Sequence, residues 1–333
     1  MQGSRSTVSL ITKRSDIVGT RIKNLQVTRV VDGDTIKVLL NDKREFLRLD
    51  CVDTEEILNH DSKPRTNAGI AAAEMAQEYF TNEHVFLTKI DVEFDGNEPL
   101  EVCLEKYRDH HGRLICYVHK QGENYNLKLI KEGWSPYFIK YGLSRLYHQE
   151  MMEAEADAQA HNRIIWNRQT NESSAFRNYR ILMPWWSLRA AIVDDFRRYG
   201  QPNGVLSVRL DYPKILGAAM KQQSITIFCD LQEGITKWIG NSAIIHTGTK
   251  DRSLKLWIPE ASDNKYAPLV DLINKRYTGL GRGYVYISGQ VTMYRDKPEI
   301  TLTHLQQLSD FYPIFQTKTL VNSPSLTYNN TQK

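Results

Sequence analysis

The chain has 333 residues, and its 43 lysines and arginines exceed its 39 aspartates and glutamates, which gives a net charge of +4 with neutral histidines. This length suffices for about two domains, and an apolar content of 41% with a charged content of 25% is typical of a globular protein rather than a disordered one. No apolar run approaches the roughly 20 residues of a membrane span and no signal-peptide pattern is visible, so we expect a cytoplasmic protein without a membrane partner. The four cysteines lack the spacing of a zinc site.

Residues 1–19 are expected to form a basic N-terminal arm, and residues 20–167 a domain in which strands precede helices. Strand-like alternation occurs at 26–31, 35–40, 46–52, 85–94 and 114–118. Helical periodicity covers 67–80 and 126–131, and a further helix begins near Ser144. This order predicts a small closed β-barrel with helices packed on it.

Residues 168–203 are expected to hold a linker and then a helix at 185–199, before a second domain at 204–312. Strand-like runs recur there at 205–210, 224–231, 243–247, 254–258, 283–294 and 299–303, with one helical segment at 267–277. Short strands interrupted by one helix favour a second small barrel of the OB type. The predicted fold class is therefore α+β, mainly β, with two barrels in tandem. The polar tail, 313–333, is predicted to be disordered.

Two acidic segments of the first domain are candidates for a metal site. Asp32-Gly33-Asp34-Thr35 places carboxylates at a tight turn, and Arg48-Leu49-Asp50-Cys51-Val52-Asp53-Thr54-Glu55-Glu56 gathers acids where a strand ends. Each segment alone is explained by a hydrogen-bonded β-turn or a solvated strand edge. Together they supply the hard oxygen ligands that Ca²⁺ or Mg²⁺ prefers.

A third segment, Arg108-Asp109-His110-His111-Gly112-Arg113, precedes an apolar strand. By itself it is a charged hairpin turn, in which the glycine provides the bend. At the start of the strand, Arg113 could reach the same cavity as Arg48.

In order and approximate spacing, these three motifs resemble the staphylococcal nuclease (thermonuclease) family. The resembling motifs are V-D-G-D-T at 31–35, R-L-D-C-V-D-T-E-E at 48–56 and D-H-H-G-R at 109–113. The resemblance covers roughly residues 20–167 and implies a barrel of the OB type that cuts nucleic acid with the help of one divalent metal, Ca²⁺ in the family.

By resemblance, each site residue has an expected role. Asp34 and Asp53 correspond to the metal-binding carboxylates, and Thr54 to the residue that offers its backbone carbonyl to the metal. Arg48 and Arg113 correspond to two phosphate-binding arginines, and Glu56 to the general base. The family usually has proline where this chain has Glu55, which we expect to be exposed. The implied reaction is endonucleolytic hydrolysis of DNA or RNA that leaves a 3′-phosphate.

Aromatic residues provide further candidates for substrate binding. Tyr141 lies where tyrosines of the family contact the substrate, although packing of an aromatic loop explains it equally well. In the second domain, Tyr284, Tyr286 and Tyr294 alternate along an expected hairpin that is typical of OB folds, which hold single strands by stacking bases on aromatic rings.

Two functions of different classes follow from these patterns. The first is an active nuclease whose second barrel helps to bind nucleic acid. The second is a catalytically silent nucleic-acid-binding or scaffold protein, as in Tudor-nuclease proteins whose repeats have lost site residues. A silent scaffold needs none of Asp34, Arg48, Asp53, Glu56 and Arg113, and their joint presence favours the enzyme.

Overall fold

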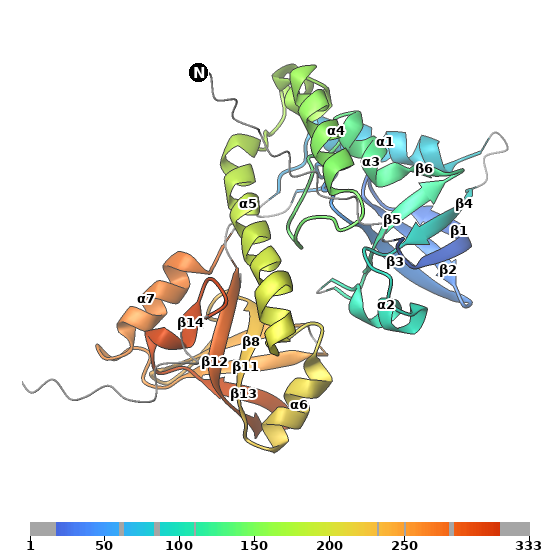
Figure 1. Cartoon of the computed structure of the whole chain (residues 1–333). Helices are drawn as coiled ribbons and strands as arrows, with labels where there is room; N and C mark the ends of the chain where they lie inside the picture. The colour runs from blue at the N-terminus through green and yellow to red at the C-terminus, as the bar shows by residue number, and fades with distance from the viewer. Residues whose placement is uncertain are drawn as a thin grey trace, which may run out of the picture. The chain divides into compact units, whose positions relative to one another are not determined.

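The computed structural model describes residues 18–59, 63–82, 87–109, 111–231, 233–249, 251–279 and 283–313 (Figure 1). The chain divides into two compact units. The first unit comprises residues 1–138 and 143–177, and the second comprises residues 139–142 and 178–333. The predicted arm 1–19 and tail 313–333 lie almost entirely outside the described residues. Within the described ranges, no helix is both long and apolar enough to cross a bilayer.

The first unit contains a closed barrel of five strands. The strands are β1 (Arg21–Val30), β2 (Thr35–Leu40), β3 (Lys43–Leu49), β4 (Lys89–Glu93) and β5 (Leu114–Lys120), with the short β6 (Glu123–Asn124) beside β5. Their order is β3-β2-β1-β4-β5, and a parallel pairing of β3 with β5 closes the barrel. Side chains alternate across each strand, so that Ile36 and Val38, and likewise Leu47 and Leu49, fill the interior.

The α-helices that the described part of this unit adds to the barrel are α1 (Asn67–Phe80), α2 (Leu100–Lys106), α3 (Tyr125–Lys131) and α4 (His148–Ala160). The Thr66 side chain caps α1 by accepting a hydrogen bond from the Gly69 amide at 3.0 Å. The buried face of α1 is built largely of alanine, and a Cβ atom on Gly69 would lie 2.2 Å from the carbonyl oxygen of Glu56. Small residues thus let α1 approach the segment that carries the acidic motif.

The second unit contains a barrel with the same strand order. Its strands are β7 (Leu206–Ser207), β8 (Ser224–Asp230), β9 (Lys237–Ile239), β10 (Ser242–Gly248), β11 (Ser253–Ile258), β12 (Tyr284–Tyr294), β13 (Lys297–Thr301) and β14 (Leu308–Ser309). The order β8-β12-β13-β11-β10 includes a parallel pairing of β11 with β13. Counted from its first long strand, the order is first, fourth, fifth, third, second, and the same cyclic order runs through the first unit, where β1 also pairs with β2. This order is consistent with an OB-type barrel.

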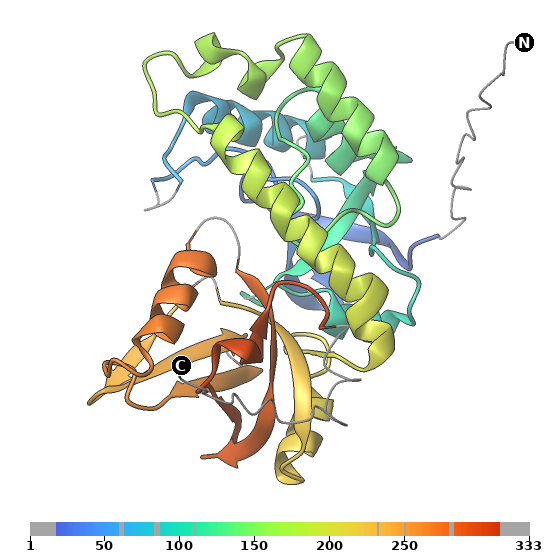
Figure 2. The same cartoon turned by 60° about the vertical axis from the view of Figure 1, so that its left-hand side comes forward.

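Among the described residues, the α-helices of the second unit are α5 (Tyr179–Asp195), α6 (Tyr212–Met220) and α7 (Ala267–Arg276). The helix α7 joins β11 to β12, and Figures 1 and 2 show α6 and α7 on different sides of this barrel. The core beneath them is apolar and includes Ile227, Leu256 and Ile300.

The sequence-based prediction of two small barrels with packed helices is confirmed. The strand at 35–40 and the helix at 67–80 have the predicted bounds. The expected helix 185–199 begins earlier, at Tyr179, and contains Pro184. The α-helices α2 and α6 were not predicted.

Candidate active site

Asp34 lies in the turn between β1 and β2, and both of its carboxylate oxygens accept hydrogen bonds. Its Oδ1 accepts a hydrogen bond from the Thr35 hydroxyl at 3.0 Å, and its Oδ2 accepts one from the Thr54 amide at 2.9 Å. The turn needs glycine before Asp34, because a Cβ atom on Gly33 would lie 2.8 Å from the side chain of Thr54. The two acidic motifs therefore meet through direct contacts between Asp34 and Thr54.

Arg48 lies in β3 opposite Thr35 of β2 and Ile115 of β5. Its Nη1 donates to the carbonyl oxygens of Leu49 at 2.8 Å and Val52 at 2.7 Å. Its Nη2 lies 2.7 Å from Asp53 Oδ1 and 3.3 Å from Asp34 Oδ2. One guanidinium nitrogen thus joins the two carboxylates that the sequence nominated as metal ligands.

Asp53 is 1% exposed and sits where the chain leaves β3. Its backbone amide donates a hydrogen bond to the Ser135 hydroxyl oxygen at 2.8 Å. Burial, the largest influence on its carboxyl, would raise the pKa of Asp53, but the charges of Lys63, Arg177 and Arg48 together hold that pKa well below its usual range. Asp53 is therefore ionised, as a metal ligand has to be.

The two glutamates that follow Thr54 point to different surroundings. Glu56 Oε1 lies 3.1 Å from Lys63 Nζ, and the Glu56 side chain is 20% exposed. Glu55 is buried, and its Oε2 accepts a hydrogen bond from Asn171 Nδ2 at 2.8 Å. The expectation that Glu55 is exposed is wrong, because the close approach of α1 and Asn171 encloses it. Glu56 is the one that shares a cation with Asp53.

Arg113 lies just before β5, and its Nε donates to Asp109 Oδ2 at 2.7 Å. Its Nη1 is 3.4 Å from the Thr35 hydroxyl, which in turn contacts Asp34. With 27% of its side chain exposed, Arg113 remains accessible to solvent at the edge of the cluster. All six site residues predicted for this unit, Asp34, Arg48, Asp53, Thr54, Glu56 and Arg113, thus belong to one connected network.

Sequence reasoning missed two cations of this network. Lys63 Nζ lies 2.8 Å from Asp53 Oδ1, and Arg177 Nη2 lies 2.8 Å from Asp53 Oδ2. Arg177 is 124 residues away from Asp53 in the chain and lies outside every recognised motif. No local pattern marks either residue, so only the fold reveals them.

The donor atoms suit a hard divalent cation. Asp34 Oδ2 and Asp53 Oδ1 converge on the same nitrogen of Arg48, so two carboxylate oxygens already face one point. Burial, followed by the charge of Asp34, raises the pKa of nearby Asp32 to about 7, as expected where negative charges crowd together. Within the described residues, no group of three His, Cys, Asp or Glu side chains forms a metal cage. A cation here would need the Thr54 carbonyl and water as further ligands.

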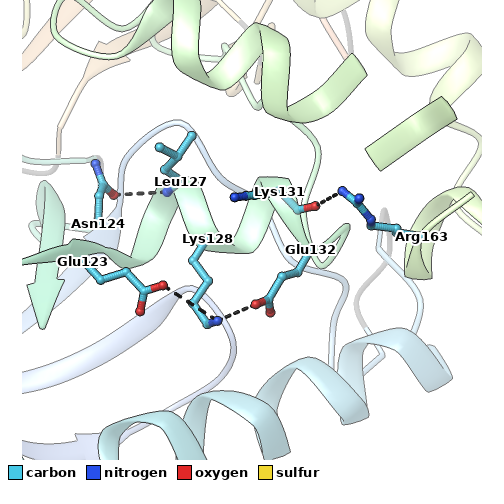
Figure 3. Close-up of a pocket in the computed structure, with 7 residues that line it drawn as sticks. All are labelled: Glu123, Asn124, Leu127, Lys128, Lys131, Glu132 and Arg163. Carbon is cyan, nitrogen blue, oxygen red and sulfur yellow. Dashed lines mark hydrogen bonds and ion pairs between the residues drawn. The ribbon is translucent and has the colours of Figure 1, made fainter. Parts of the chain in front are cut away.

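A separate hollow of about 420 Å³ lies beside α3 (Figure 3). Lys128 lines this hollow and forms ion pairs with Glu123 and Glu132, which also line it. None of the site residues named above lines this hollow, whose walls are Glu123, Asn124, Leu127, Lys128, Lys131, Glu132 and Arg163. It is therefore distinct from the acidic and basic cluster.

The four tyrosines nominated for substrate binding belong to the second unit and have different surroundings. Tyr286 is 1% exposed and its hydroxyl donates to Asp195 Oδ1 at 2.6 Å, so it is a core residue and its proposed stacking role has to be withdrawn. Tyr284 is partly buried and stacks on Phe228. Tyr294 is 46% exposed. The Tyr141 carbonyl oxygen accepts a hydrogen bond from Arg197 Nη2 at 3.3 Å.

The first unit is thus a small OB-type barrel with two arginines, Arg48 and Arg113, and the carboxylates of Asp34 and Asp53 near the ends of its strands. The family model described as "Staphylococcal nuclease homologue" matches residues 47–168. Endonuclease YncB of Bacillus subtilis is 28% identical over 148 residues, which cover 44% of this chain and 64% of that relative. Thermonucleases of Staphylococcus hyicus and Staphylococcus intermedius are 32% and 34% identical; each match covers 43% of this chain and 75% of the relative. The chain belongs to the staphylococcal nuclease family, and these relatives support a nuclease of the thermonuclease type.

Proposed function

We propose that this protein is a metal-dependent endonuclease that hydrolyses phosphodiester bonds of DNA or RNA and leaves a 3′-phosphate. The observation that carries the proposal is the contact of Arg48 Nη2 with both Asp34 and Asp53, in a cluster that also includes Glu56 and Arg113. A silent scaffold has no need to bring these charges together. The thermonuclease relatives lend further support to hydrolysis of nucleic acid.

The proposed metal is Ca²⁺, held by Asp34, Asp53 and the Thr54 carbonyl. When bound, a divalent cation neutralises the phosphate and lowers the pKa of a coordinated water. The other steps depend on side chains of this protein. In this proposal Arg113, at the accessible edge, donates to the phosphate oxygens through its planar guanidinium. The Glu56 carboxylate accepts the proton of the attacking water, and the 5′ oxygen leaves from phosphorus.

The proposal is tested with the purified full chain on single- and double-stranded DNA and RNA. Each substrate is incubated with Ca²⁺, Mg²⁺, Mn²⁺ or a chelator, and the product ends are mapped. We expect internal cleavage with Ca²⁺, products with 3′-phosphate ends, and none with chelator. Binding of nucleic acid without cleavage under every condition would instead establish the silent reader.

We further propose that the second barrel binds single-stranded nucleic acid on the outer face of β11, β12 and β13. Lys255 Nζ lies 3.9 Å from the ring centroid of Tyr294 and 5.0 Å from that of Trp257, and the same ammonium pairs with Glu299. Burial is the largest cause that lowers the pKa of His246, and the positive charges of Lys297, Lys255 and Lys237 lower it further. Positive charge interleaved with aromatic rings suits a nucleic-acid strand.

A further inference from the structure

Lys63 occupies a distinctive place in the candidate site, because its single ammonium lies between two carboxylates. Its Nζ is 2.8 Å from Asp53 Oδ1 and 3.1 Å from Glu56 Oε1. These carboxylates are the proposed metal ligand and the proposed general base. In this arrangement Glu56 is held by a cation of the protein itself.

Asp53 is surrounded by more positive charge than one buried carboxylate needs. Besides Lys63, Arg48 Nη2 lies 2.7 Å from Asp53 Oδ1, and Arg177 Nη2 lies 2.8 Å from Asp53 Oδ2. A divalent cation added to this set would meet three positive side chains around one aspartate. Like charges at such distances repel strongly where water is excluded, so metal binding requires at least one of the three to withdraw.

The anchoring of the three cations indicates which one leaves. Arg48 is fixed by two backbone carbonyls and is buried. Arg177 uses Oδ2, the oxygen not shared with Arg48, and only 6% of its side chain is exposed. Lys63 shares Oδ1 with Arg48, on the side where Asp34 lies, and 33% of its side chain is exposed. A flexible lysine stem can swing into solvent at lower cost than either arginine can move.

We propose that Lys63 is the built-in counter-ion of Asp53 and Glu56 in the metal-free protein, and that the divalent cation displaces it on binding. The inference rests on the proposed metal dependence of the site. It couples two events, because the withdrawal of Lys63 opens Asp53 Oδ1 to the metal and releases Glu56 at the same moment. Without metal, the base stays paired and the site is held inactive.

The test is calorimetric titration of the full chain with Ca²⁺, comparing the wild type, Lys63→Met and Lys106→Met. Lys106 is a matched control, since it also forms an ion pair in the first unit, with Glu98, away from the site. We expect Lys63→Met to bind Ca²⁺ more tightly on the order of tenfold, the scale on which groups around metal ligands act. Lys106→Met and Lys63→Arg, which keep the charge at position 63, should bind as the wild type does.

A second readout follows thermal unfolding in chelator and in excess Ca²⁺. Lys63→Met should unfold at a lower temperature than the wild type in chelator, because Asp53 and Glu56 lose a counter-ion, and should gain more from Ca²⁺. Lys63→Gln, which retains a hydrogen-bond donor without charge, gives the same comparison if the methionine variant folds poorly.

The possible failures can be told apart. Unchanged or weaker Ca²⁺ binding by Lys63→Met and Lys63→Gln, with normal binding by the wild type, overturns this inference alone and leaves the proposed nuclease intact. Cleavage in chelator by a wild type that binds no Ca²⁺ overturns both the metal dependence and the inference.

Discussion

Glu55 and Glu56 are adjacent in the chain, yet their carboxylates have separate partners: Glu55 accepts a hydrogen bond from Asn171, whereas Glu56 pairs with Lys63. The Asn171 side chain also accepts a hydrogen bond from the Ala68 amide at the start of α1, at 2.9 Å. Glu55 therefore belongs to the packing between α1 and the segment near Asn171. Glu56 belongs to the charged cluster.

This separation predicts different consequences for the two glutamates. Glu56→Gln should lower turnover by about 10²–10⁴-fold, the usual contribution of a general base, with little change in stability. Glu55→Leu should leave Asn171 without an acceptor that it now uses, costing about 1–3 kcal/mol of stability with turnover nearly intact. Turnover numbers and thermal unfolding of both variants check this. If Glu55→Gln proved more damaging to turnover than Glu56→Gln, the assignment of the base would be off by one residue.

Arg113 offers the cleaner test of phosphate binding. Arg48 is buried between two aspartates, so Arg48→Ala should disrupt the fold as well as the chemistry. Arg113→Ala should lower turnover by about 10²–10³-fold, as the loss of one transition-state donor does, while the unfolding temperature stays close to that of the wild type. Arg163→Ala is the control, since Arg163 also pairs with an aspartate and has 33% of its side chain exposed. Equal activities of the two variants would exclude Arg113 from the site.

Asp34 is the more informative of the two proposed metal ligands. Asp34→Asn preserves the size of the side chain and an acceptor for the Thr54 amide, so the turn should persist. Ca²⁺ binding, followed by calorimetry, should weaken strongly because a charged ligand is lost. Asp53→Asn would also leave Lys63, Arg48 and Arg177 facing a neutral amide, and we expect it to unfold more readily. Full Ca²⁺ affinity in Asp34→Asn would rule out the proposed ligand set.

The contacts of Glu93 predict how the stability of the first unit changes at low pH. It accepts hydrogen bonds from His119 Nε2 at 2.8 Å and Arg21 Nη2 at 3.0 Å, and also from the Tyr147 hydroxyl. Burial alone, the largest influence, would raise the pKa of Glu93, but these bonds lower it to about 2. A carboxyl with a depressed pKa stabilises the fold above its unfolded pKa and loses that contribution as pH falls toward 2.

Glu93→Gln should therefore flatten the loss of stability between about pH 4.5 and pH 2, with an effect of at most about 3 kcal/mol at neutral pH. Hydrogen exchange of the β4 and β5 amides reports on this unit without interference from the other. Identical acid profiles for the variant and the wild type would show that the contacts around Glu93 contribute nothing to acid stability.

The outer face of the second barrel is tested through Tyr294. Loss of one stacked base contact typically costs about 1–3 kcal/mol, so Tyr294→Ala in the full chain should bind single-stranded DNA more weakly. Turnover on a very short substrate should not change. Tyr199→Ala is the control, because Tyr199 lies in the same unit and is exposed to a similar degree, 49%. Affinity measured at two salt concentrations should fall with salt in the wild type; equal affinity for both variants would argue against this face.

The sequence predicts the framework of both units because periodicity is a local property. The alanine stripe of α1 and the alternation in β2 are visible in single segments, and both elements have the predicted bounds. The short helix α2 has only seven residues and no side-chain cap, so it leaves little periodic signal. The surroundings of Glu55, Tyr286 and Arg177 depend on partners distant in the chain, which no local pattern encodes.

The shared strand order of the two barrels makes one position comparable between them. Arg48 is the penultimate residue of β3, and Trp257 is the penultimate residue of β11; each lies between buried residues of its own strand and points away from the barrel core. Each pairs with the second strand of its barrel on one side and with the fifth on the other. The same position in the barrel thus holds an arginine, proposed to bind phosphate, in the first unit and a tryptophan, proposed to lie on the nucleic-acid face, in the second. The substitution Trp257→Arg would therefore test whether the position in the barrel, rather than the surrounding sequence, determines where a polyanion binds.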